Sequence, residues 1–300
     1  MTITIVSDTG CDLPPALVDQ YGIHLVPLVL RFGEQEVRDT PETRAELWRR
    51  VEAGLPNDTS GPPVGAYEAT FAPLMAAGHE VVCITLTGTH SVTYNSAWVA
   101  AQAFPERITV IDGRSVSIGY GLQALEAARL AAAGANRVAI TAAVQSLQSR
   151  IMIRFFLESL EQVKRGGRLD ALMPMLNRLG QTLDVRTVLT VNEQGRISLV
   201  GPARGRRGAI KRLLQDAIAT APVEQVVVAH TWAAEEADAL AGELATELEF
   251  PREQIYVVEA GSVFIAHAGK GMMGAGTVSA DQLLADQAIG SLSGTPGRRG

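Results

Sequence analysis

The sequence is poor in cysteine and has no long apolar run. Its two cysteines, Cys11 and Cys83, are too few for a disulfide framework and lack the spacing of a metal site. No stretch approaches the roughly 18 apolar residues that a transmembrane helix requires. The amino terminus has neither the charged segment nor the apolar block of a signal peptide. We therefore expect a soluble protein of the reducing cytoplasm.

Positive charge is also in short supply. The 300 residues include 26 Lys and Arg against 32 Asp and Glu, a formal net charge of -6. This balance argues against a nucleic-acid partner and against a polybasic membrane anchor. The sequence has no zinc-binding histidine pair, no nucleophile elbow and no G-x-x-x-x-G-K-[ST] phosphate loop. From the residues alone, neither an enzyme nor a metal or other cofactor is indicated.

Apolar residues are abundant instead, at 47% of the chain, which is enough for a sizeable core or an internal cavity. Residues 1–150 alternate strand-like and helix-like segments, which is typical of a parallel sheet with helices on both faces. Residues 151–290 contain a hairpin signal at 192–195, which predicts a mixed sheet. The polar residues 291–300 are expected to form a disordered tail. The predicted fold is α/β with two domains, a three-layer α/β/α parallel-sheet domain and a two-layer mixed-sheet domain.

Local patterns place the individual elements. Strands are expected over residues 2–6, 24–30, 80–86, 107–111, 151–156, 187–191, 196–200, 225–230 and 254–258. Helices are expected over residues 15–21, 41–53, 64–77, 117–133, 137–149, 208–221 and 235–247, with a shorter one over 159–163. Residues 54–63 are predicted to be a loop and residues 269–274 a glycine-rich turn.

The stretch over residues 85–97 is unusually rich in hydroxyl groups. It joins an apolar strand to a helix-like segment and contains Thr85, Thr87, Thr89, Ser91, Thr93 and Ser96. Ligands of open α/β sheets bind at the carboxyl ends of the strands, and a helix that begins there offers free N–H groups to an anion. We interpret the stretch as an anion site without a fixed positive charge. The alternative is a helix whose first turn is capped by Ser91 or Thr89 alone.

Two glycine-flanked features near the carboxyl end are ambiguous. Residues 269–274 match the letters of a G-x-G-x-x-G dinucleotide fingerprint, but no βαβ unit follows them. A turn with close backbone approach is the simpler interpretation. His267, just before this turn, is either a core histidine or a ligand contact.

Basic residues gather at the start of a predicted helix, at Arg204, Arg206, Arg207, Lys211 and Arg212. They form either a solvated face or a docking surface for an anionic partner, because cations at a helix amino terminus oppose the helix dipole.

Three aspartates follow predicted strands and support a different function. Asp8, Asp12 and Asp112 would hold Mg²⁺ in a transferase or hydrolase that acts on a small phosphorylated or carboxylated substrate. Strand-end aspartates also cap helices and turns, which is the alternative. A purely structural or regulatory protein would bind no ligand at all.

Several blocks together resemble the DegV family. The family opening D-S-x-x-D-L-P is similar to S-D-T-G-C-D-L-P at 7–14, T-S-Q-P-S to T-S-G-P-P at 59–63, and S-S-x-L-S-G-T-Y-x-S-A to residues 87–97. K-G-G-R is similar to R-G-G-R at 165–168, and H-T-G-P-G to H-A-G-K-G at 267–271. The blocks occur in family order and span nearly the whole chain.

The resemblance implies a non-enzymatic carrier with a long-chain fatty acid buried between two α/β domains. It implies that Thr59, Ser60, Ser91 and Thr93 contact the carboxylate, with Val92 and His267 beside it. In some such proteins a separate kinase phosphorylates the bound acid, and by position Arg168 and Arg204 would lie near its docking face. The resemblance also leaves room for transient contact with a membrane surface. Val92, Gly88, Ala268, Lys270 and Met173 depart from the family pattern.

Overall fold

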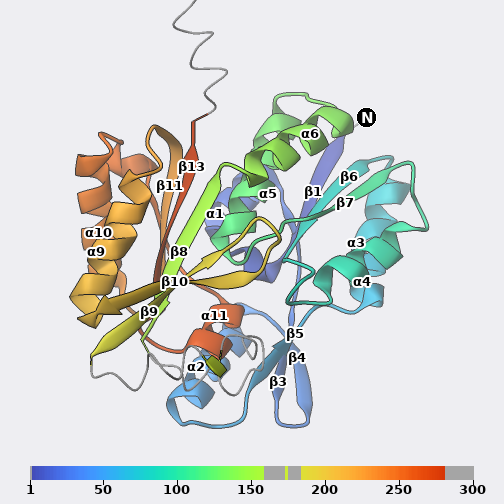
Figure 1. Cartoon of the computed structure of the whole chain (residues 1–300). Coiled ribbons are helices and arrows are strands. Elements are labelled where there is room, and N and C mark those ends of the chain that lie inside the picture. Colours follow the sequence, from blue (N-terminus) through green and yellow to red (C-terminus); the bar gives the residue numbers. More distant parts are fainter. Residues whose placement is uncertain (1, 159–172, 175–183, 281–300) are drawn as a thin grey trace, which may run out of the picture.

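The computed structural model describes residues 2–158, 173–174 and 184–280, which contain three sheets (Figure 1). The first is a four-stranded parallel sheet in the order β2-β1-β6-β7. Its strands are β1 (Ile3–Asp8), β2 (His24–Val26), β6 (Glu80–Thr85) and β7 (Ile108–Asp112). The candidate Arg168, the short helix predicted over 159–163 and the tail predicted over 291–300 lie outside the described residues.

Helices cover both faces of the parallel sheet, which confirms the predicted three layers. They are α1 (Pro15–Tyr21), α3 (Val64–Ala76), α4 (Thr93–Ala101), α5 (Ile118–Ala132) and α6 (Arg137–Gln148). Neighbouring residues of β6 point to opposite faces, as in any strand. Cys83 packs in the cluster formed with α3 and α4, and Ile84 packs in the cluster formed with α5 and α6. Both side chains are fully buried, as expected of a parallel strand.

The second sheet has six strands in the order β10-β9-β8-β13-β11-β12 and is mixed, as predicted. Its strands are β8 (Ile151–Leu157), β9 (Val185–Val191), β10 (Ile197–Arg204), β11 (Val223–His230), β12 (Tyr256–Glu259) and β13 (Met273–Ser279). Helices α9 (Gly205–Ile218) and α10 (Ala234–Glu247) cover one face. The other face carries Phe155, Leu189 and Val227 and shares a core with α5. The two large sheets therefore meet across one continuous apolar cluster.

A third, three-stranded antiparallel sheet was not predicted. It consists of β3 (Val29–Phe32), β4 (Gln35–Arg38) and β5 (Asp58–Ser60) in the order β4-β3-β5. Its companion helix α2 (Pro41–Glu52) begins as predicted, with Thr40 and Thr43 forming a capping box. The loop predicted over 54–63 was partly wrong, because β5 lies inside it and pairs Thr59 with Leu30.

The segment around His267 also differs from the prediction. Helix α11 (Ser262–Ala268) carries His267 in its last turn, and β13 begins soon after. The glycine-rich turn is real at Gly269 and Gly271, whose φ angles are 69° and 86°. The chain then becomes a central strand between β8 and β11, where Gly274 and Gly276 pack against Phe155 and Ile153.

Two short 3-10 helices, Thr9–Cys11 and Arg252–Gln254, complete the described elements. Within the part of the chain that the structure describes, no helix combines the length and the apolar character needed to cross a bilayer.

Candidate functional site

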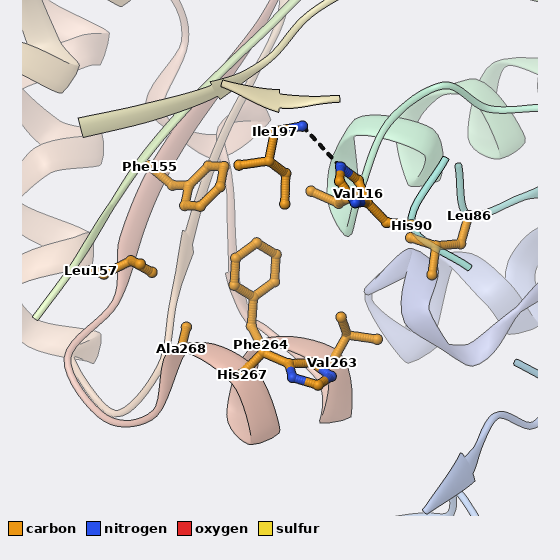
Figure 2. A pocket seen from close by; sticks show the side chains of 10 residues that line it. All are labelled: Leu86, His90, Val116, Phe155, Leu157, Ile197, Val263, Phe264, His267 and Ala268. Atoms are coloured by element: carbon orange, nitrogen blue, oxygen red, sulfur yellow. Dashed lines mark hydrogen bonds between the residues drawn. The ribbon is translucent and has the colours of Figure 1, made fainter. Parts of the chain in front are cut away.

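An apolar cavity of about 70 Å³ lies where the two large sheets meet (Figure 2). Its wall comes from the loops after β6 and β7, from β8 and β10, and from α11. The apolar lining includes Leu86, Val116, Phe155, Leu157, Ile197 and Phe264. The polar side chains among the described lining residues are those of His90 and His267. No element builds this cavity alone, because each contributes only one or a few side chains.

A hydroxyl and an imidazole meet beside this cavity. His267 Nε2 lies 2.8 Å from Thr59 Oγ1 and 3.9 Å from Asp58 Oδ1. The two residues are 208 positions apart and come together because β5 packs against α11. Thr59 is buried, and the His267 side chain is 16% exposed. The structure therefore brings together two of the predicted site residues.

The start of α4 adds two more predicted hydroxyls to this region. Ser91 Oγ lies 2.6 Å from Thr93 Oγ1 and accepts a hydrogen bond from the Thr93 amide at 3.3 Å. Gly61, two residues after Thr59, touches this turn so closely that a Cβ on it would lie 2.5 Å from Thr93 Oγ1. The end of β5 and the start of α4 are thus in contact.

The other predicted residues of this region play different parts. Ser60 is half-buried at the end of β5, and Val92 is 58% exposed at the start of α4. Thr89 donates its hydroxyl to the carbonyl of Gln194, away from the Ser91 pair. The hydroxyl-rich stretch is therefore divided between a helix start and an anchor for the β9–β10 hairpin. The capping alternative is not met in its simple form, because the N-cap of α4 is Val92 and forms no side-chain cap, although Ser91 accepts from the Thr93 amide.

In the sequence, His90 is a second histidine that could reach a ligand as His267 could, but the sequence does not reveal its partner. Its Nε2 accepts a hydrogen bond from the Ile197 amide at 3.0 Å, so the β9–β10 hairpin is tied over the cavity (Figure 2). Ile197 lies 107 residues away from His90 in the chain, and no local sequence pattern predicts this hydrogen bond. The signal in the sequence is only that a histidine interrupts a run of hydroxyl residues.

The strand-end aspartates are engaged in caps and turns. Asp8 accepts hydrogen bonds from Tyr120 Oη at 2.5 Å and from the amides of Leu86 and Gly10 at 3.1 Å each. Asp112 accepts from the amide of Gly88 at 3.2 Å. No group of three or more His, Cys, Asp or Glu side chains in the described residues is arranged to hold a metal ion. The contacts are those of the capping alternative.

Asp12 joins the amino-terminal region to α11. It accepts hydrogen bonds from the Gly261 amide at 2.9 Å and from the hydroxyl of Ser117. Burial raises the pKa of Asp12 to about 7, although these hydrogen bonds and Arg44 act in the opposite direction. The beginning of α11, and with it His267, is therefore held by a polar contact from the first loop of the chain.

The buried carboxyl of Asp8 provides a test of how burial raises pKa values in this protein. Burial raises its pKa from 3.8 to about 6. The folded protein then holds a proton that the unfolded chain has already released, so the contribution of Asp8 to the unfolding free energy declines from about pH 4 to about pH 6. Asp8→Asn abolishes this titration. We expect the stability advantage of wild type over Asp8→Asn to shrink by on the order of 3 kcal/mol across that range.

Urea denaturation of the two proteins at matched pH steps measures this difference. An advantage that stays constant with pH, or grows as the pH rises, would contradict the raised pKa of Asp8.

The predicted docking arginine Arg204 is not among the residues that line the cavity. It is exposed, ends β10 and precedes α9. Its neighbour Arg206 is committed to ion pairs with Glu158 and Glu236 at 2.8 and 2.7 Å. It also donates to the carbonyl of Gly271 at 2.6 Å, which links α9 to the turn after His267.

The fold and the site together define an α/β protein with an apolar cavity between two large sheets and hydroxyl and imidazole groups beside that cavity. The family model described as "Uncharacterised protein, DegV family" matches residues 2–280. The chain belongs to the DegV family, as the motif resemblance predicted.

Relatives match this chain over nearly their whole length. A DegV domain-containing protein from Caldanaerobacter subterraneus subsp. tengcongensis is 31% identical over 274 residues, which cover 89% of this chain and 95% of the relative. A DegV domain-containing protein from Deinococcus radiodurans is 30% identical over 280 residues, which cover 91% of this chain and 97% of the relative.

Solved structures of the family share the fold. A fatty-acid-binding DegV family protein from Thermus thermophilus has a TM-score of 0.83 and 32% identity, over 93% of this chain and all of that one (100%). A stearic-acid-binding protein from Eubacterium ventriosum has a TM-score of 0.82 and 27% identity, over 92% of this chain and 98% of that one. The predicted α/β fold class is confirmed by these neighbours.

Proposed function

We propose that this protein binds a long-chain fatty acid. The acyl chain lies in the apolar cavity, and the carboxylate lies at the end of the cavity beside the Ser and Thr hydroxyls. Thr59, Ser60, Ser91 and Thr93 hold the carboxylate, with Val92 and His267 beside it. The observation that carries the proposal is the Thr59–His267 pair beside a mostly apolar cavity. The fatty-acid-binding neighbours of the same fold support it.

The apolar lining supplies the affinity. Each methylene group removed from water contributes about 0.8 kcal/mol, so a long chain gains on the order of 10 kcal/mol before the costs of binding. The cavity of about 70 Å³ is smaller than the roughly 150 Å³ that accommodates benzene in another protein. A long acyl chain therefore requires side chains such as Phe155 and Phe264 to turn aside as it enters.

The polar end of the proposed site suits a carboxylate that is later released to another protein. The described residues of the cavity lining include no lysine or arginine. Hydroxyl and amide donors hold a carboxylate less tightly than a bidentate arginine does. We propose that the bound acid is presented to a separate kinase that forms the acyl phosphate, which fits a carboxylate held without a fixed cation. The exposed Arg204 belongs to the face on which that kinase docks.

Extraction of the purified protein with organic solvent, followed by mass spectrometry, tests fatty-acid binding. We expect roughly one acyl chain per protein molecule, because the Thr59–His267 pair provides one carboxylate site beside the cavity. After delipidation, the folded protein should take up a long-chain acid and remain inactive toward ATP without a second protein. Folded protein that carries no acyl chain and takes none up would refute the proposal.

A further inference from the structure

A second, smaller cavity of about 20 Å³ lies behind the first. The two cavities share three lining residues, Val116, Phe155 and Phe264. The rings of Phe155 and Phe264 stand edge to face, with their centroids 5.4 Å apart (Figure 2). They form the partition between the front and the rear cavity, so a chain that passes them continues into the rear one.

The rear cavity is closed by Ile153 and by the glycines of β13. Ile153 is 7% exposed and lines the rear cavity together with Gly274 and Gly276. It also lines a polar groove of about 570 Å³ on its other side, to which Gln123 and Arg154 contribute. Ile153 thus separates an apolar space from a polar one.

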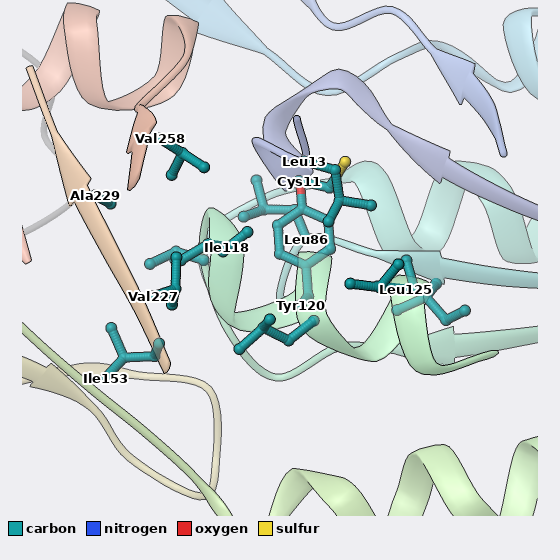
Figure 3. Close-up of a cluster of buried hydrophobic side chains, with 14 of the residues drawn as sticks. Cys11, Leu13, Leu86, Ile118, Tyr120, Leu125, Ile153, Val227, Ala229 and Val258 are labelled. Atoms are coloured by element: carbon teal, nitrogen blue, oxygen red, sulfur yellow. The ribbon is translucent and has the colours of Figure 1, made fainter. Parts of the chain in front are cut away.

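The contact between Ile153 and β13 is tight. A Cβ at Gly276 would lie 2.7 Å from Ile153 Cδ1 and 2.9 Å from Val227 Cγ1, and Ile153 and Val227 are both labelled in Figure 3. A Cβ at Gly119 would lie 3.0 Å from Ile153 Cγ1. Glycine at these positions leaves the space that the Ile153 side chain and the rear cavity occupy.

We propose that Ile153 is the stop for the methyl end of the bound chain and sets the longest acyl chain that this protein accepts. The inference rests on the proposed fatty-acid binding and adds the residue that decides chain length. A chain that fills both cavities ends against Ile153 and Gly276. A longer chain has to displace the Ile153 side chain. The added methylene groups of the acyl chain then reach the polar groove, where they meet amide and guanidinium groups.

Chain-length preference follows from this geometry. Up to the stop, each added methylene group should raise affinity about fourfold. Beyond it the gain ends, and the cost of displacing Ile153 makes the affinity fall. Ile153→Ala removes three carbon atoms from the stop and should move the optimum to longer acids, by about two carbon atoms. Gly276→Ala adds a methyl group against Ile153 and should move the optimum to shorter acids.

The experiment is a titration of delipidated protein with straight-chain saturated acids that differ by single methylene groups. It compares wild type, Ile153→Ala and Gly276→Ala. Gly242→Ala is the matched control, because a Cβ there meets nothing within 4 Å. Ile153→Val removes one methyl group and serves if Ile153→Ala does not fold.

The expected result is an optimum that is longer in Ile153→Ala or Ile153→Val, shorter in Gly276→Ala and unchanged in Gly242→Ala. Wild-type protein that binds acids, together with folded Ile153 variants that keep its optimum, would overturn the stop and leave the proposed function intact. Wild-type protein that binds no acid of any length would overturn both.

Discussion

Replacing Asp39 by alanine is expected to lower the free energy of unfolding by about 3–5 kcal/mol. The side chain of Asp39 is fully buried, at 0% exposure, and its carboxylate is the centre of a polar network. It accepts two hydrogen bonds from Arg44, at 2.7 and 3.1 Å. It also accepts from the hydroxyls of Thr9 and Ser262, at 2.6 Å each.

The size of the effect comes from what the alanine leaves behind. Arg44 would keep its charge in a partly buried position without its carboxylate, and two hydroxyls would lose their acceptor. The three groups come from the first loop, from α2 and from α11, so the network joins the small sheet to the helix that carries His267. We expect fatty-acid affinity to fall as well, because Thr59 and His267 sit on the parts that this network holds together.

Urea denaturation with linear extrapolation measures the loss. Glu36→Gln is the matched control, because it removes a carboxylate from an ion pair with Arg31 in which both side chains are about half exposed, at 57% and 46%. An exposed pair of this kind contributes at most about 1 kcal/mol. If Asp39→Ala costs no more than Glu36→Gln, the network does not stabilise the protein.

Replacing Ser91 by alanine is expected to weaken fatty-acid binding roughly ten- to a hundredfold. The variant removes one hydrogen bond to a charged acceptor, which is worth about 1.5–3 kcal/mol. Thr59→Val should have a similar effect, because it keeps the shape of the side chain and removes only the hydroxyl. His267→Ala should weaken binding less than either, because in the proposed site the histidine stands beside the carboxylate and contacts Thr59.

Calorimetric titration of delipidated protein measures these affinities, and thermal unfolding in parallel reports on the fold. Thr89→Val is the control, because its hydroxyl serves the carbonyl of Gln194 in the hairpin. Its affinity should stay within about threefold of wild type. If Ser91→Ala melts the protein while the folded fraction keeps its affinity, Ser91 is only a helix cap, as its bond to the Thr93 amide would allow.

Local patterns predicted most elements within a few residues. Helix α2 begins at Pro41 after the Thr40 cap, and the hairpin signal at 192–195 does join β9 and β10. The two failures have different causes. Strand β13 contains glycines, which disfavour strands, yet it occupies the middle of the mixed sheet because Phe155 and Ile153 pack into the space that the missing side chains leave. Strand β5 is too short for any periodic pattern to reveal it.

The candidate site was predicted as separate motifs, and the distances between them were not. The order of the motif blocks identified the family, and Thr59, Ser91, Thr93 and His267 were singled out from their letters. Nothing in the sequence indicated that His90 would accept from the Ile197 amide. The sequence also contained no indication that Asp39 would form hydrogen bonds to three distant segments, because an aspartate followed by a threonine and a proline predicts only the start of a helix.

By itself, the sequence determined the α/β class, the alternation of elements and the residue types at the hydroxyl end of the site. These properties depend on hydrogen bonds and side-chain periodicities that span a few neighbouring residues. Tertiary structure alone decided that Thr59 meets His267, that Phe155 and Phe264 divide the cavity, and that Ile153 closes it. Those contacts join residues that are far apart in the chain, and they form only because burial of both large sheets in one core brings the residues together.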